Sequence, residues 1–324
     1  MVNRPAGRDA GPAAVCRAQA GADQGPVEQS DRPFPALRRA TCQRPAQCAS
    51  VPRPPLFGKS AGRADAIARI SIEQIKAYYQ RAFTASNATI VLVGDLSHEQ
   101  ARQMAEHIAG TLPTGPALPS IPAPAATEPE LYHLEHPGTQ TTLLVGLPAP
   151  AANHPDRAAL TVLNQILGGK GLRTRLMHEL RTRRGLTYGA YSRLQLQRSA
   201  GIWGMQLGVE HRYRDATLHV VEQLLHDYVE HGPTQQELDD TRRKLLGELL
   251  LASASNAGKL AQLQDIAFNQ LAPDHQAQFI NAIQALSIDQ LKVVLKNHLQ
   301  IDKLVQISVG PLSDQEPLPT HTTD

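Results

Sequence analysis

Histidine and carboxylate side chains on one helix face could bind zinc and activate water, and the chain has 13 histidines. None of them begins the H-x-x-E-H pattern, which places two imidazoles and a general base together. The closest arrangement is His226, Glu230 and His231. Its two histidines are five positions apart, so on a helix they point about 140° away from each other. We therefore expect this group to be the exposed end of a helix.

Two other histidine pairs are also poor candidates for a metal site. His133 and His136 flank Glu135, but residues three apart in a strand lie on opposite faces. His98 and His107 share one expected helix but are nine positions apart, too far for one ion. We expect no metal ligands in this chain.

The cysteines and the familiar catalytic motifs exclude further chemistry. Cys16, Cys42 and Cys48 all lie within residues 1–57, so residues 58–324 have no disulfide, thiolate metal site or cysteine nucleophile. The sequence contains no P-loop, no G-x-G-x-x-G after a strand and no G-x-S-x-G elbow. The formal net charge of +2 gives no reason to expect a nucleic-acid partner.

Residues 1–57 differ in composition from the rest of the chain. They hold nine Pro, eleven Ala and eight Arg against four acidic residues, and no Lys, Ile or Tyr. Such a segment cannot bury enough apolar surface to fold, so it is either a disordered basic arm or a product of the wrong reading frame. Neither a secretory h-region nor a run of about 18 apolar residues is visible.

Two stretches of the chain match each other without a gap. Residues 70–97 read ISIEQIKAYYQRAFTASNATIVLVGDLS and residues 286–313 read LSIDQLKVVLKNHLQIDKLVQISVGPLS, an offset of 216 positions. Both start with an S-x-x-Q capping box, continue with apolar residues at helical spacing, and end in β-rich runs at 89–93 and 304–309. We expect an internal duplication whose first copy lacks its front.

Further elements outline the second unit. Strands are expected at 131–147 around Pro137-Gly138, at 187–194 and at 201–209. Helices are expected at 155–167, at 172–184 with Leu172, Leu176 and Leu180 on one face, at 212–230, and from a T-x-x-E box at Thr234 to about residue 251. The fold class is therefore α+β, with two homologous units of antiparallel sheet plus helices.

The whole chain is expected to divide into five parts. They are an arm at 1–57, a first-unit remnant at 58–115, a Pro/Ala-rich linker at 116–130, a second unit at 131–313 and a tail at 314–324.

One longer segment resembles a known family. Residues 163–192, LNQILGGKGLRTRLMHELRTRRGLTYGAYS, are similar to the hallmark region in the C-terminal domains of pitrilysin/insulinase-family (inverzincin) zinc metallopeptidases. In that family a Gly-rich turn precedes S/T-R-L, then L-R, then a G-L-x-Y tyrosine. The matching residues are Thr174-Arg175-Leu176, Leu180-Arg181 and Gly185-Leu186-Thr187-Tyr188. Residues 136–150 resemble the family's domain-opening strands, and the resemblance covers about 64–312.

The resemblance implies a fold and a site. Two α+β sandwich units form one half of a clamshell around the substrate. One half carries H-x-x-E-H and binds zinc, and the other supplies an Arg/Tyr pair that holds the peptide. Arg181 and Tyr188 match that pair, although a solvated helix-end arginine and an ordinary strand tyrosine are the plain alternatives. Arg175 and Gln140 also match family positions, and we expect structural roles for them.

On this resemblance we expect a substrate-binding, non-catalytic subunit of a zinc endopeptidase, with Arg181 and Tyr188 as its substrate-binding residues. Zinc would lie on an H-x-x-E-H-bearing partner in a heterodimer, or on a missing N-terminal part. The resemblance suggests the periplasm, with the cytoplasm as the alternative. Other hypotheses are a fragment of a complete zinc metallopeptidase, a non-enzymatic scaffold subunit and an inactive product of a damaged gene.

Overall fold

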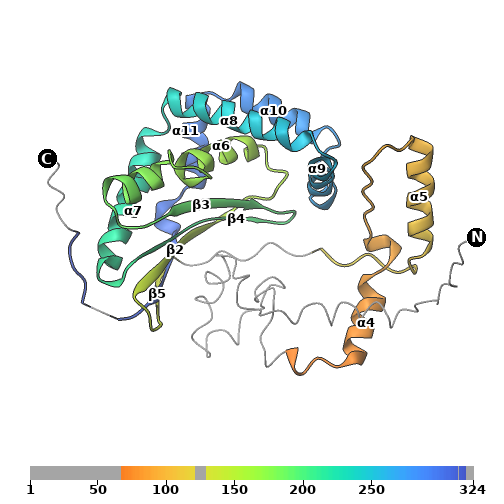
Figure 1. The fold of residues 1–324 in the computed structure, drawn as a ribbon, viewed down its shortest axis with the longest axis horizontal. Helices are drawn as coiled ribbons and strands as arrows, with labels where there is room; N and C mark the ends of the chain where they lie inside the picture. Colours follow the sequence, from red (N-terminus) through yellow and green to blue (C-terminus); the bar gives the residue numbers. More distant parts are fainter. Residues whose placement is uncertain (1–66, 121–128, 313, 319–324) are drawn as a thin grey trace, which may run out of the picture.

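The computed structural model describes residues 67–120, 129–312 and 314–318 (Figure 1). The arm expected at 1–57 and the centre of the expected linker lie outside the described residues. Within the described part, no helix is both long and apolar enough to cross a membrane.

A five-stranded mixed sheet forms the centre of residues 129–312. Its spatial order is β1-β5-β2-β4-β3, and its strands are β1 (Leu131–Glu135), β2 (Gln140–Ala149), β3 (Ala190–Leu196), β4 (Gly201–Glu210) and β5 (Val305–Gly310). Strands β2, β3, β4 and β5 pair antiparallel, and β1 runs parallel to β5. The largely antiparallel sheet is confirmed. The two strands around Pro137-Gly138 do not pair with each other, because β5 lies between them.

Helices cover one face of this sheet (Figure 1). They are α6 (Arg157–Gly168), α7 (Arg214–His231), α8 (Gln235–Ser253), α9 (Asn256–Phe268), α10 (His275–Ala285) and α11 (Ile288–His298). Three begin where the sequence predicts: α8 at the Thr234/Glu237 capping box, α11 at Ser287/Gln290, and α6 close behind Pro155. This arrangement confirms the α+β class.

The main hydrophobic core lies between the sheet and these helices. Leu143, Val145 and Leu147 alternate along β2 and point into it, whereas Leu144 faces a smaller cluster with Val305 and Ile307. Helix α6 ends at Gly168, where a Cβ would lie 2.4 Å from Leu176 and 2.7 Å from the backbone nitrogen of Ser192. This close approach fixes the C-terminal end of α6 against β3 and the segment after the helix.

The regular helix predicted at 172–184 is wrong in its details. The segment turns helical near Arg175 and then widens into the π-helical η3 (Met177–Arg183). Leu176 and Leu180 are fully buried, as expected, but Leu172 is 65% exposed because it precedes the helical turns. π-helical turns widen the backbone and change the direction of the side chains that follow.

Residues 67–120 contain α4 (Ile72–Ala82), the short 3₁₀ turn η2 (Ala85–Asn87) and α5 (His98–Gly110). The local conformations recur 216 positions later. Helix α4 and α11 each have a capping box, and their C-caps Phe83 and Leu299 have ψ angles of 69° and 72°. The turn η2 corresponds in the same way to η5 (Ile301–Lys303).

The strand predicted at 89–93 is wrong. Its counterpart at the same offset belongs to β5 and pairs with β1 and β2, but residues 88–93 have no partner strand among the described residues. A strand needs a neighbour to satisfy its backbone groups, so composition alone does not produce one.

The expected tail contacts the helical unit. The backbone N–H of Glu316 donates to the carbonyl of Arg212 at 2.8 Å, and the Gln315 side chain bonds to Asp215 and His211. Leu318 packs against the edge of the main core. Residues 314–318 are therefore held to the start of α7.

Candidate functional site

Arg181 and Tyr188 lie together at one end of the sheet. Arg181 belongs to η3, and Tyr188 lies in the turn two residues before β3. The guanidinium carbon of Arg181 is 4.9 Å from the centre of the Tyr188 ring, a distance typical of a cation–π contact. Tyr188 is 88% exposed. The seven-residue spacing in the sequence therefore becomes a side-chain pair at the surface.

The turn between the two residues is built around Gly185. Its φ of +62° suits glycine, which lacks the Cβ that makes this conformation costly. The Gly185 N–H donates to the carbonyl of Arg181 at 3.0 Å, and the Leu186 N–H donates to the carbonyl of Leu180 at 2.8 Å. These bonds close the π-helical turn on its buried anchor Leu180 and reverse the chain toward Tyr188.

The arginines near Arg181 are paired with a carboxylate, whereas Arg181 is not paired with one among the described residues. Glu179 accepts from Arg184 at 2.7 Å and from Arg183 at 3.1 Å. Burial alone would raise the pKa of Glu179, but the hydrogen bonds from these two arginines outweigh it and lower the pKa. No carboxylate within the described residues pairs with Arg181. Its charge therefore remains available to a ligand.

Arg175 has a different environment. Its guanidinium makes two hydrogen bonds of 2.7 Å to Glu237 and one of 2.9 Å to the carbonyl of Gly232, and it stacks on Tyr228 at 4.5 Å. All its principal contacts are internal, in keeping with the structural role expected for it. Gln140 is the exposed first residue of β2.

The chain's residues do not fit the zinc motif of a pitrilysin-type peptidase. His226, Glu230 and His231 lie on the outer part of α7, and they do not form a group of ligand atoms. The described residues contain one such group, His154, Asp156 and His298. Sequence inspection missed it because 142 positions separate Asp156 from His298, and no short motif spans that distance.

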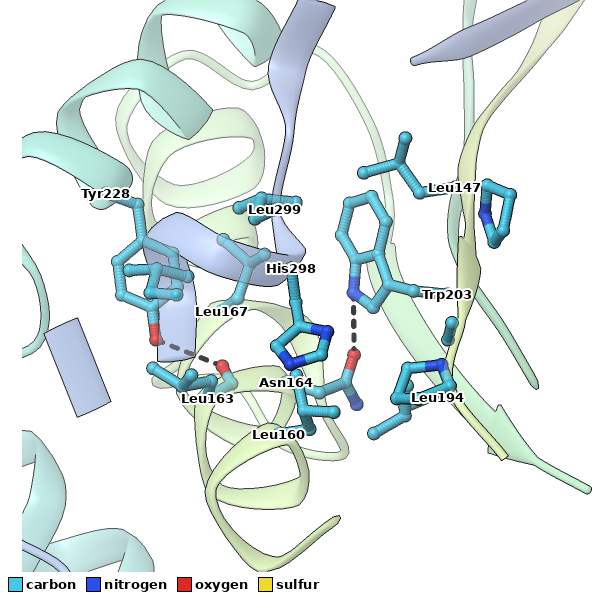
Figure 2. Close-up of a pocket in the computed structure, with 14 residues that line it drawn as sticks. Leu147, Leu160, Leu163, Asn164, Leu167, Leu194, Trp203, Tyr228, His298 and Leu299 are labelled. Carbon is cyan, nitrogen blue, oxygen red and sulfur yellow. Dashed lines mark hydrogen bonds between the residues drawn. The ribbon is translucent and has the colours of Figure 1, made fainter. Parts of the chain in front are cut away.

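A small cavity opens between α6, α11 and the sheet, with a volume of about 40 Å³ (Figure 2). Half of its 14 lining residues are leucines, and Asn164 accepts a hydrogen bond from the Trp203 indole at 3.1 Å. The cavity has room for a few water molecules only, so it does not suit a peptide.

Comparison with known proteins places this geometry in a family. Residues 69–245, more than half of the chain, match the family model described as the peptidase M16 inactive domain. A crystal structure of an M16 inactive domain from Pseudomonas fluorescens is 36% identical, with a TM-score of 0.80 over 88% of this chain and 66% of that one. A protease structure from Helicobacter pylori, 19% identical with a TM-score of 0.71, shares the fold over 77% of this chain and 61% of that one.

Curated relatives carry two kinds of name. The "non-peptidase homolog YmxG" of Helicobacter pylori is 25% identical over 251 residues, which are 77% of this chain and 58% of the relative. The "uncharacterized zinc protease SCO5738" of Streptomyces coelicolor is 25% identical over 282 residues, 82% of this chain and 60% of the relative. The chain thus spans about three-fifths of the length of these relatives. The expected pitrilysin/insulinase resemblance is confirmed: the chain belongs to the M16 peptidase family, through the region described as its inactive domain.

Proposed function

We propose that this chain is the substrate-binding, non-catalytic half of a zinc endopeptidase, and that Arg181 and Tyr188 hold the peptide. The observation that carries the proposal is the surface pair itself. An arginine without a carboxylate partner among the described residues lies against a tyrosine that is 88% exposed. A side-chain pair with a purely structural role would be more buried and better satisfied, as Arg175 and Tyr228 are.

The two side chains suit a peptide carbonyl. A guanidinium and a phenol O–H both donate hydrogen bonds, and both can approach the same oxygen from solvent. Donors aimed at a scissile carbonyl orient the peptide and stabilise the negative charge that develops on its oxygen. Neither group can activate water here, so the pair serves binding and charge stabilisation.

Strand β3 offers a continuation of the same surface. It begins two residues after Tyr188 and lies at the edge of the sheet, where it pairs only with β4 among the described residues. An extended peptide can add to a free strand edge through main-chain hydrogen bonds. A peptide held at Arg181 and Tyr188 would therefore have backbone partners along β3.

The proposal assigns zinc to a partner. No histidine of this chain begins H-x-x-E-H, so in this proposal the general base and the metal come from outside these residues, on an H-x-x-E-H-bearing M16 subunit or on a further part of the same protein. The inactive-domain family and the non-peptidase name of the Helicobacter relative support this division of labour.

The test uses the chain mixed with an H-x-x-E-H-bearing M16 subunit from the same genome, and measures hydrolysis of a quenched fluorescent peptide. Arg181→Ala should lower kcat/KM on the order of 100-fold and Tyr188→Phe about tenfold, because each removes a donor to the reacting carbonyl. Arg183→Ala is the matched control, since Arg183 is a neighbouring arginine already paired with Glu179. It should change kcat/KM by less than about twofold. Equal rates for all three variants would refute the role of the pair.

A further inference from the structure

Three potential metal ligands meet at the opposite end of α6 from the Arg181 region. His154 and Asp156 immediately precede α6, and His298 is the last residue of α11. Asp156 Oδ2 lies 2.8 Å from His298 Nε2 and 3.7 Å from His154 Nδ1. The imidazole rings are 5.2 Å apart and perpendicular. One ligand atom from each residue lies within 4.8 Å of the other two.

These separations suit a small divalent cation. Zinc binds histidine nitrogen and carboxylate oxygen at about 2.0–2.2 Å, which puts neighbouring ligand atoms roughly 3–4 Å apart. The side chains are between 22% and 34% exposed, so solvent can reach the group and water can fill a remaining position. A ligand set of two imidazoles and one carboxylate favours zinc and the neighbouring first-row metals, because calcium and magnesium take mainly oxygen ligands.

A simpler role is structural: the hydrogen bond between His298 and Asp156 holds the end of α11 against the start of α6. One detail goes beyond that role. Aspartate at an N-cap ordinarily bonds to its own helix, but the Asp156 side chain makes no capping bond. His154 Nδ1 accepts the backbone N–H of Asp156 at 3.1 Å, so it is the unprotonated nitrogen, and a metal ion bound there would replace this hydrogen bond.

The surrounding charges also permit a cation. Arg157, the nearest arginine in sequence, directs its guanidinium to Asp265 at 2.8 Å and to the carbonyl of Ala152. His298 lies at the C-terminal, partially negative end of α11, which favours positive charge. The start of α6 has the opposite polarity, and the Asp156 carboxylate counters it. Leu160 and Asn164 line the same cavity as His298 and lie beside its ring (Figure 2).

We propose that His154, Asp156 and His298 form a binding site for a zinc-like divalent cation that ties the start of α6 to the end of α11. The site does not depend on the proposed peptide-binding role. Helix α6 is about 18 Å long, and its far end contacts Leu176 beside η3. Loss of the metal should therefore leave the Arg181/Tyr188 pair in place.

The experiment titrates Zn²⁺ into the full chain by calorimetry, after alkylation of Cys16, Cys42 and Cys48, whose thiolates would otherwise bind the metal. We expect one site that becomes at least about tenfold weaker in His298→Ala and in Asp156→Asn. Asp156→Asn keeps the size of the side chain, so it remains informative if His298→Ala does not fold. Co²⁺ should give the visible absorption of a low-coordinate nitrogen-ligated ion in wild type and lose it in both variants.

The controls are His226→Ala and His231→Ala, which remove exposed histidines of α7 that form no such group. Both should bind Zn²⁺ as wild type does. The site would be overturned if wild type bound no Zn²⁺ at about 1 mM, the weak end of specific affinity. Unchanged affinity in Asp156→Asn or a correctly folded His298→Ala would also overturn it, because the metal would then lie elsewhere.

Discussion

At the scale of single residues, three arginines within nine positions have different surroundings. Arg175 is held by Glu237, Gly232 and Tyr228, and Arg181 lies at the surface against Tyr188. Arg183 is exposed and pairs with the mostly buried Glu179. Sequence spacing and the family resemblance singled out Arg181 and Tyr188, and the structure brings them together. The motif alone could not show that Arg181 is unpaired among the described residues, because its potential partners come from distant parts of the chain.

The Arg175–Glu237 pair should make stability depend on acid pH. Burial alone would raise the pKa of Glu237, but hydrogen bonds from Arg175 and from the Thr234 backbone outweigh it and hold the pKa below 4.5. A carboxylate with a lowered folded-state pKa stabilises the fold above about pH 4.5, and that contribution is lost as pH falls through the folded value. Arg175→Met should cost about 2–3 kcal/mol in the free energy of unfolding at pH 7, and less at about pH 3.

Urea unfolding followed by circular dichroism across this pH range measures the difference. Arg183→Met, which removes a pair whose arginine is 65% exposed, is the control and should cost less than about 0.5 kcal/mol at any pH. A constant difference between wild type and Arg175→Met from pH 7 to about pH 3 would contradict the assignment to Glu237.

At the scale of elements, local signals in the sequence predicted helices better than sheet neighbours. The capping boxes at Ser71, Thr234 and Ser287 all occur at helix starts. The N-cap residue and the N3 residue are only three positions apart, so the sequence alone shows both partners of the interaction. Sheet pairing depends on residues far away in the sequence. This is why the sequence did not predict the parallel pairing of β1 with β5, and why the strand expected at 89–93 does not form. The His154, Asp156 and His298 group escaped detection for the same reason.

Ser287→Ala tests a capping box directly. The Ser287 hydroxyl accepts the Gln290 N–H at 3.3 Å, and the Gln290 side chain accepts the Ser287 N–H at 2.9 Å. Removing the hydroxyl should lower the free energy of unfolding by about 1 kcal/mol. Thermal and urea unfolding should both report it. Ser199→Ala, in the exposed β3–β4 turn, should be neutral; an equal effect of both variants would mean that the cap adds nothing.

At the scale of the whole molecule, the helices α4 and α11 have similar sequences, but their apolar side chains are buried to different extents. Leu291 and Leu295 of α11 are at most 3% exposed against α6 and α7, whereas the residues 216 positions earlier, Ile75 and Tyr79 of α4, are 41% and 39% exposed. The shared caps and turns support the proposed duplication. The contrast in burial indicates that the apolar face of α4 lacks the kind of neighbours that α11 has among the described residues.

The family membership and the unpaired surface arginine combine into one central claim, that this chain binds peptide and its partner cuts it. The most direct measurement is hydrolysis of a quenched fluorescent peptide by the chain alone, by an H-x-x-E-H-bearing M16 subunit alone, and by their mixture. The account predicts no hydrolysis by this chain alone and a rate in the mixture that saturates with one copy of each subunit. EDTA-sensitive hydrolysis by the chain alone, or a partner rate unchanged by adding it, would contradict the account.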